Sequence, residues 1–184
     1  MTLDKAIINR RSIRRFKSDP LTKEQIEAIL LAGNSAPSAK NGQQWRFHVF
    51  QKEAKEKFTS YCLEEFDKIA EKYDAHPYAR HSFAIMKEAP VVVLVLCIKN
   101  PLNHPSRPDI QSVSAAIQNM LLKAYDLGLG SLWICDILYT EEAVKRYINT
   151  DMQIIATVAF GYAASEPRNI SKLSVNDVTT WHED

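Results

Sequence analysis

Apolar side chains recur every three or four positions in several stretches of the chain, the spacing that places them on one face of a helix. The clearest stretch starts at Asp109, a candidate N-cap, and its apolar positions are Ile110, Val113, Ile117, Met120, Leu121 and Ala124. Another helix is predicted to begin at Thr22, because Thr22 and Gln25 have the spacing of a capping box. Gly128 and Gly33 are the predicted ends of these two helices.

Three further helices are predicted from weaker signals. They are a first helix built on Leu3, Ala6 and Ile7, a charged helix from Lys52 to about Tyr73, and a short helix from Thr140 to about Asn149. Pro77 and the polar residues before it are loop signals, and three prolines lie between Asn100 and Pro108. We therefore interpret residues 74–90 and 100–108 as loops.

Strands are predicted where the apolar pattern changes to alternation or to a short continuous run. Trp45, Phe47 and Val49 alternate with polar neighbours, which is typical of a strand with one buried face. Continuous apolar runs indicate buried strands at residues 91–98, 131–135 and 154–160. Helices interleaved with such strands predict one layered domain over residues 1–184, with helices covering a sheet that is hydrophobic on both faces.

The C-terminal segment, residues 162–184, has a different pattern from the rest of the chain. It is polar, contains Pro167 and has too few periodic apolar residues for a core element. We expect this extension to pack on a partner subunit.

Composition and charge exclude several classes of function. The chain has 184 residues, 46% of them hydrophobic, and a formal net charge of +1, so nothing predicts general binding to nucleic acid or to an anionic membrane. Its three cysteines are far apart and lack the spacing of a metal site. With no signal-peptide pattern at the N-terminus and no apolar run of membrane-spanning length, we expect a cytoplasmic protein.

The densest group of positive charge is Arg10-Arg11-Ser12-Ile13-Arg14-Arg15, at the end of the first predicted helix. Guanidinium groups and a hydroxyl offer the directional, charge-assisted hydrogen bonds that a phosphate needs. A solvated basic face fits the spacing equally well. An arm for nucleic acid fits less well, because no aromatic residues are interleaved with the arginines.

Two other segments have unusual compositions. Residues 35–45 form a polar loop of small side chains that leads directly into a strand, and such a loop lets backbone approach a heterocyclic ligand; a plain turn is the alternative. Residues 127–136 contain Gly-Leu-Gly followed by Ser-Leu-Trp. This is no dinucleotide fingerprint, because it follows a helix instead of opening one.

Together, in this order and at these separations, the three segments resemble the nitroreductase family of flavoproteins, over the chain from about Asn9 onward. The resemblance implies an α+β fold with a central, mostly antiparallel sheet flanked by helices. It also implies an intertwined homodimer with FMN at the interface.

The resemblance implies two FMN sites in the dimer, each built from residues of both subunits. At the phosphate it implies Arg10 and Ser12, with Arg11 and Arg14 close by. From the other subunit, beside the flavin ring, it implies Pro37, Ser38 and Ala39, while Asn41 and Gln43 match the loop motif and serve the loop as well as the flavin. Along the ring, mainly through backbone, it implies Trp133, Ile134 and Cys135.

The resemblance extends to the C-terminal segment, and the chain departs from the family pattern at two positions of the loop. The family's C-terminal segment usually brings a basic residue to the phosphate, and Arg168 or Lys172 stands where that residue is expected. The family commonly has Pro at the position of Gln44 and Ser at the position of Ala39, so the opening above the flavin is expected to differ. Neither difference removes a phosphate ligand.

The implied activity is transfer of hydride or electrons from NADH or NADPH, through bound FMN, to small electron-poor acceptors such as nitroaromatics or quinones, by a ping-pong mechanism. No catalytic side chain is expected, because the flavin carries the chemistry, and no metal is expected. Dehalogenation, dehydrogenation or flavin fragmentation on the same scaffold, and a non-catalytic flavin-binding protein, are the alternatives. The sequence shows no selector between NADH and NADPH.

Overall fold

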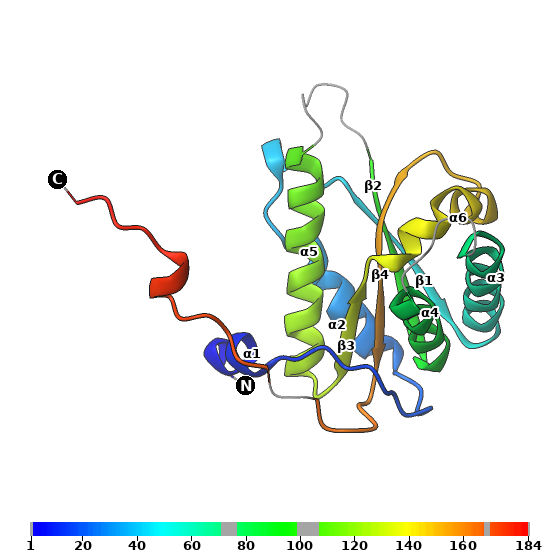
Figure 1. Ribbon diagram of the computed structural model, residues 1–184, viewed down its shortest axis with the longest axis horizontal. Coiled ribbons are helices and arrows are strands. Elements are labelled where there is room, and N and C mark those ends of the chain that lie inside the picture. The colour runs from blue at the N-terminus through cyan, green and yellow to red at the C-terminus, as the bar shows by residue number, and fades with distance from the viewer. Residues whose placement is uncertain (1, 71–76, 99–106, 168–169, 184) are drawn as a thin grey trace.

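A four-stranded antiparallel sheet forms the centre of the computed structural model, which describes residues 2–70, 77–98, 107–167 and 170–183. The strand order is β1-β2-β4-β3 (Figure 1), and the bounds are Trp45–Gln51 for β1, Val91–Cys97 for β2, Gly130–Ile134 for β3 and Gln153–Gly161 for β4. The predicted α+β class and the mostly antiparallel sheet are therefore confirmed, and β3 is an edge strand.

Both faces of the sheet are hydrophobic, as the continuous apolar run of β2 predicts. Val92, Leu94 and Leu96 point into one buried cluster and Val93 and Val95 into the other, because successive side chains of a strand point to opposite faces. All seven residues of β2 are buried. The sheet therefore needs helices on both sides.

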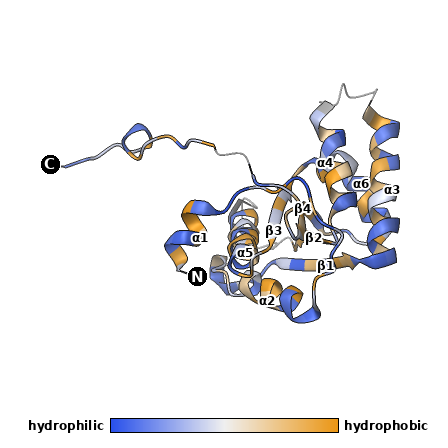
Figure 2. Cartoon of the chain, turned by 90° about the horizontal axis from the view of Figure 1, so that it is seen from below, coloured by the Kyte–Doolittle hydropathy of each residue, from blue (hydrophilic) through white to orange (hydrophobic). Residues whose placement is uncertain are grey.

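Five helices supply those two layers (Figures 1 and 2). On one face lie α2 (Lys23–Asn34) and α5 (Arg107–Asp126), and on the other lie α3 (Lys52–Ala70), α4 (Pro77–Glu88) and α6 (Glu141–Ile148). A short first helix, α1 (Leu3–Asn9), lies outside these layers near one end of α5, and of the three apolar residues on which it was predicted only Ala6 is buried.

The capping box predicted at the start of α2 is confirmed, whereas the predicted end of the helix at Gly33 is not. The capping box at Thr22 is present, with the Gln25 backbone N–H donating to the Thr22 hydroxyl and the Thr22 N–H donating to the Gln25 side chain. Gly33, predicted as the end of the helix, lies within it instead. A Cβ on Gly33 would lie 2.7 Å from the Met120 side chain, so this glycine allows α2 and α5 to approach closely.

The interpretation of residues 74–90 as a loop was wrong over residues 77–88, which form α4. Ala79, Phe83 and Met86 bury the inner face of this helix, and their spacing of four and three is the helical signal that the prolines and polar residues of the segment obscured. Asp109 is a first-turn residue of α5 and not its N-cap. Most of the predicted 100–108 loop lies outside the described residues.

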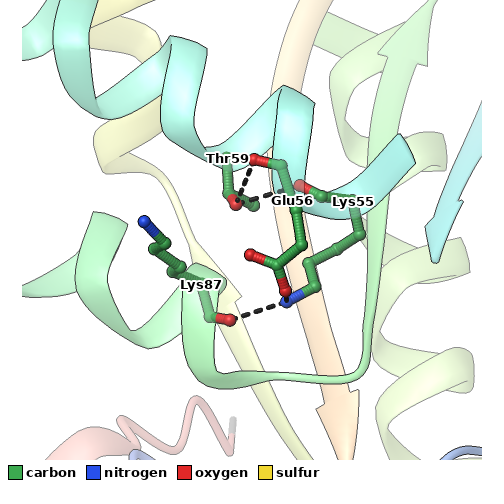
Figure 3. A network of polar contacts seen from close by, with 4 residues as sticks. All are labelled: Lys55, Glu56, Thr59 and Lys87. Carbon is green, nitrogen blue, oxygen red and sulfur yellow. Dashed lines mark hydrogen bonds and ion pairs between the residues drawn. The ribbon is translucent and has the colours of Figure 1, made fainter. Parts of the chain in front are cut away.

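Helix α3 is joined to the C-terminal end of α4 by a buried lysine (Figure 3). The Lys55 ammonium donates to the backbone carbonyl of Lys87 at 2.7 Å and pairs with the Glu56 carboxylate, while its side chain is only 6% exposed. A carbonyl in the last turn of a helix has no partner within the helix, and a cation there is favoured by the helix dipole. Lys55 therefore caps α4 from the neighbouring helix.

The segment after β4 leaves the body of the molecule and extends away from it (Figure 1). It contains one short 3-10 turn, η3 (Asn176–Val178), and its large apolar side chains are exposed: Ile170, Leu173, Val175, Val178 and Trp181. The largest of these side chains, Trp181, is 72% exposed. Within the described part of the chain this segment buries no core residue, which agrees with the polar pattern of residues 162–184.

Candidate functional site

The basic cluster begins where α1 ends. Arg10 is the C-cap of α1 and is half-buried, and burial, followed by the nearby positive charge of Arg11, lowers the pKa of its guanidinium. Among the described residues no carboxylate pairs with Arg10, whereas Arg15 of the same segment pairs with Glu88 at 3.4 Å. A half-buried cation beside a second cation is an environment that an anion would stabilise.

The neighbouring Arg11 has a different arrangement. Its guanidinium donates to the backbone carbonyls of Ile8 at 2.6 Å and of Arg10 at 3.0 Å. These contacts close the C-terminal end of α1, so Arg11 holds the local backbone. Arg14, the third arginine predicted to lie near the phosphate, is exposed to solvent.

Ser12 is held against the sheet edge. It forms an isolated parallel bridge with Ser131 of β3, and the N–H of Ile13 donates to the Ser131 carbonyl at 3.0 Å. The absence of a side chain at Gly130 permits this approach, because a Cβ there would lie 2.7 Å from Ile13 Cγ1. The basic cluster and the Gly-Leu-Gly segment, far apart in the sequence, are therefore adjacent in the fold.

The C-terminal segment starts from the same region. Phe16 bridges to Ala163, and the Ala164 N–H donates to the Arg15 carbonyl at 2.9 Å. Of the two candidate basic residues of this segment, Lys172 is exposed and lies on the extended part, and Arg168 lies outside the described residues. The fold thus brings the base of the extension, though not Lys172 itself, beside the basic cluster.

The residues that end β3 occupy two faces. Trp133 packs on the face covered by α2 and α5, whereas Ile134 points into the opposite cluster and Cys135 is exposed. The Trp133 indole N–H is buried, and it lies close enough to the Cys135 thiol to oppose in part the rise that burial causes in the pKa of Cys135. Ile134 is the last residue of the edge strand that Ser12 joins, and Cys135 comes directly after it, so the backbone from Ser131 to Cys135 runs on from the basic cluster.

The loop that precedes β1 is held by its own polar groups. The Ser38 hydroxyl accepts from the Gln43 N–H at 3.1 Å, and the Gln43 side-chain amide donates to Asn41 Oδ1 at 3.4 Å. Pro37 is exposed, and Ala39 donates its N–H to Ser112 of α5 at 3.0 Å. Ser38, Asn41 and Gln43 therefore serve the conformation of the loop in this chain.

Within one chain, this loop and the basic cluster lie at opposite ends of α5 (Figure 1). The loop contacts Ser112 in the first turns of the helix, and the cluster contacts Ser131, just beyond its last residue. From Ser112 to Asp126 the helix rises about 20 Å. The structure therefore joins the basic cluster to β3 and leaves the small-residue loop apart from both.

Three polar residues beside the loop were missed as a group by sequence reasoning. Gln44, Asp109 and Ser112 are all buried, and they connect the loop to the first turns of α5. Asp109 was noted only for its position at a helix start, and no spacing signal links it to Gln44, which is 65 residues away in the chain.

A surface groove of about 580 Å³ lies elsewhere, between α3, α6 and the 3-10 turn η2 (Asp136–Thr140). Glu65, Glu141 and Glu142 line it together with Arg146, which lies 3.8 Å from Glu65. None of the predicted site residues that the structure describes lines this groove. In the described residues, no group of three metal-ligating side chains is placed to hold an ion, and no helix is long and apolar enough to span a membrane.

The fold thus defines an α+β domain whose helix-covered sheet carries a basic cluster at its edge strand. The chain belongs to the nitroreductase family, whose profile matches residues 7–162, and this places it among the oxidoreductases. A relative from Methanothermobacter thermautotrophicus, provisionally named NADH dehydrogenase/NAD(P)H nitroreductase, is 32% identical over 91% of this chain and 80% of its own length.

Solved structures give the same fold. A protein from Desulfovibrio desulfuricans, provisionally described as a nitroreductase in complex with FMN, has a TM-score of 0.80 at 26% identity and covers 100% of this chain and 98% of its own. A BluB-like flavoprotein from Clostridium difficile has a TM-score of 0.83, with both chains covered completely, at 24% identity. The second likeness concerns the fold alone.

Proposed function

We propose that the protein is an FMN-dependent oxidoreductase that uses NADH or NADPH to reduce small electron-poor acceptors such as nitroaromatics or quinones. The observation that carries this proposal is Arg10, a half-buried guanidinium without a carboxylate partner among the described residues, beside Ser12 on the sheet edge. Its environment fits the phosphate of FMN, the cofactor in the Desulfovibrio structure.

The roles proposed for the phosphate side come from the family resemblance, and the positions of Arg10, Arg11 and Ser12 support them. Arg10 would supply a charge-assisted fork and Ser12 a hydroxyl, while Arg11 holds the backbone that carries both. Arg14 would add positive charge from the solvent side. Either Arg168 or Lys172 would approach from the C-terminal extension, whose base is tied to Arg15.

The flavin side uses few side chains. When bound, FMN would take hydride from NADH or NADPH and pass it to the acceptor in a ping-pong cycle, so the protein needs no acid-base pair of its own. Backbone groups at Trp133, Ile134 and Cys135 would lie along the ring. Pro37, Ser38 and Ala39 would cover it from the second subunit, where Asn41 and Gln43 keep the loop in shape.

The need for two subunits is supported by the position of the loop. In one chain the loop and the basic cluster are separated by most of α5, whereas a two-fold axis passing beside the middle of α5 would bring the loop of each copy towards the cluster of the other. Residues 162–184 of the single domain would then pack on the partner subunit, which would cover the exposed apolar side chains of this segment. The free cysteines favour a cytoplasmic location.

Cofactor analysis and subunit mixing together test the proposal. The purified or reconstituted protein is expected to hold one FMN per chain, to form a dimer by light scattering, and to oxidise NADH or NADPH steadily with a quinone or nitroaromatic. Identification of FAD, or of no flavin after reconstitution, would refute the central claim. Flavin binding without turnover on any acceptor would favour the non-catalytic alternative.

Mixing tests the shared site directly. A subunit with Arg10→Ala and a subunit with Ala39→Trp are each expected to be poorly active alone. Their mixture should regain activity, because a heterodimer contains one site built from two unaltered contributions. No recovery after demonstrated subunit exchange would place both residues in the same site of one chain.

A further inference from the structure

The loop before β1 concentrates backbone strain. Lys40, Asn41 and Gln43 all have φ between 45° and 53°, and the only other non-glycine residues with positive φ in the described chain are Lys52 and Asn149. Such conformations cost of order 1 kcal/mol or more each and persist only where surrounding contacts impose them. The hydrogen bonds of Ser38, Asn41 and Gln43 within the loop supply part of these contacts, and side chains outside the loop supply the rest.

A buried polar clamp, formed by Gln44, Asp109 and Ser112, provides those contacts. The Gln44 side-chain amide donates to Asp109 Oδ1 at 2.8 Å and approaches the Ala39 carbonyl at 3.4 Å. The Ser112 hydroxyl accepts from the Ala39 N–H at 3.0 Å and itself donates to the Pro108 carbonyl at 2.7 Å. Both backbone groups of Ala39 are thus fixed to side chains of the clamp.

Gly42 leaves the space that the clamp needs. A Cβ on Gly42 would lie 2.5 Å from Gln44 Nε2 and 3.2 Å from the Ala39 carbonyl oxygen. Because the amide nitrogen is held between Asp109 and Ala39, it has no free direction in which to move. The loop sequence and the clamp are therefore matched to each other.

The clamp lowers the stability of the folded protein compared with an apolar contact at the same place. Gln44 is 3% exposed, and its Oε1 has no hydrogen-bond partner among the residues that the structure describes. A buried acceptor without a donor is destabilising, and an apolar side chain of similar shape would avoid that loss. Strain at three residues and an unsatisfied amide oxygen in one short loop point to a function other than stability.

We propose that Gln44, Asp109 and Ser112 are positioning residues that fix the 37–43 loop on the end of α5, so that Pro37, Ser38 and Ala39 meet the flavin ring of the opposite site in one defined geometry. This inference rests on the proposed function. None of the three residues needs to touch the flavin, because Gln44 and Ser112 act through the backbone of Ala39 and Asp109 acts through Gln44.

Two substitutions of Gln44 and one compensating change test the clamp itself. Gln44→Ala removes both hydrogen bonds, and Gln44→Glu places a carboxylate against Asp109. Combining Gln44→Glu with Asp109→Asn restores a donor and an acceptor with their positions exchanged. Gln51→Ala is the matched control, since Gln51 is an exposed glutamine at the other end of β1.

Hydrogen exchange of the FMN-free protein measures how firmly the loop is held when no flavin is present. The amides of Ala39, Asn41 and Gly42 are expected to exchange at least about tenfold faster in Gln44→Ala and Gln44→Glu, as loss of a hydrogen bond to a charged group predicts. Exchange should return towards that of the parent in the double variant and should not change in Gln51→Ala. Unchanged exchange in Gln44→Ala and Gln44→Glu would show that the clamp does not hold the loop.

Measurements on the FMN-bound protein then test whether the clamp positions the loop against the flavin ring. In Gln44→Ala the visible circular dichroism of bound flavin is expected to change, and its reduction by NADH or NADPH to slow by roughly tenfold, because misplaced groups around a reacting centre cost rate. FMN affinity should fall less, since the phosphate contacts remain. A loosened loop with unchanged spectrum and reduction rate would overturn the positioning role. If the parent binds no FMN, the proposed function fails with it, while the exchange data still decide the clamp.

Discussion

Gly130 lies directly against Ile13, so closely that a Cβ on Gly130 would be 2.7 Å from Ile13 Cγ1 and 2.9 Å from Ile13 Cβ. The Ile13 Cβ is the branch point of a buried side chain and cannot swing away, so the backbone of residues 10–14 must move instead. We predict that Gly130→Ala weakens FMN binding at least about tenfold, because the displaced segment carries Arg10 and Ser12. Fluorescence titration with FMN measures this effect.

The same Gly-Leu-Gly motif provides the control. Gly128 has φ of +73°, but apart from its chain neighbours no described residue lies within 4 Å of where a Cβ would stand. Gly128→Ala is expected to lower the free energy of unfolding by about 1 kcal/mol through backbone strain alone. Its FMN affinity should equal that of the parent. If both variants lost FMN affinity equally, the contact between Gly130 and Ile13 would not be what holds the phosphate site in place.

Arg10→Ala is predicted to weaken FMN binding by about 1.5 to 3 kcal/mol, or roughly tenfold to a hundredfold, through loss of hydrogen bonds to a charged group. Arg10→Lys should restore only part of this, because an ammonium cannot reproduce the guanidinium fork. The fold should survive, since no described carboxylate depends on Arg10. Arg15→Ala, which removes an exposed ion pair with Glu88 in the same segment, is the control and should bind FMN normally.

Much of the fold was predictable because periodicity reports burial directly. The alternation of Trp45, Phe47 and Val49 and the continuous run that forms β2 both became strands of a sheet covered on two faces. Helix α4 was not predicted, because Pro77 and its polar neighbours dominated the local signal while the buried positions are few. Gly33 was misjudged for a similar reason: its role depends on Met120, in a helix far along the chain.

The candidate site was predictable only as separate segments. Local composition marked the Arg10 cluster and the small-residue loop, but nothing in the sequence shows that Ser12 would pair with Ser131. The clamp was harder still, because Gln44 and Asp109 are ordinary polar residues until the fold buries them against each other. Polar burial is a tertiary property that one sequence does not display.

Thiol reactivity follows from the burial of the three free cysteines. Cys62 and Cys97 are buried and Cys135 is exposed. We predict that one thiol per chain reacts with a disulfide reagent in the native protein, more slowly than a free thiol because burial raises the pKa of Cys135, and that the other two react only after unfolding. Mass spectrometry should identify Cys135, and bound FMN should slow its labelling if the end of β3 lies along the flavin. Labelling of Cys62 in folded protein would contradict the packing of α3.

The pH dependence of stability is predicted from the same burial. Desolvation raises the pKa of Cys62 from the ordinary 9.0 to about 12, and that of Cys97 to about 11. The unfolded chain therefore loses these protons first, so the free energy of unfolding should decline as the pH rises from 9 towards 11. Urea unfolding at several pH values measures the slope. Cys62→Ala, though less stable overall, should show a shallower decline, and an unaltered slope would assign the effect to other groups.

Lys55 is predicted to stabilise the protein through the end of α4 and not through its charge alone. Its ammonium donates to the Lys87 carbonyl from a side chain that is 6% exposed, so Lys55→Ala removes the cap and leaves buried space beside it. We expect a loss of about 2 to 3 kcal/mol in the free energy of unfolding, measured with urea at one protein concentration. Lys55→Met keeps the aliphatic stem and avoids burying a charge, so it should lose less than Lys55→Ala. Lys57→Ala removes only an exposed pair with Glu53 and should cost under about 0.5 kcal/mol. If Lys55→Ala and Lys57→Ala were equally mild, the contact with Lys87 would contribute nothing to the joining of α3 and α4.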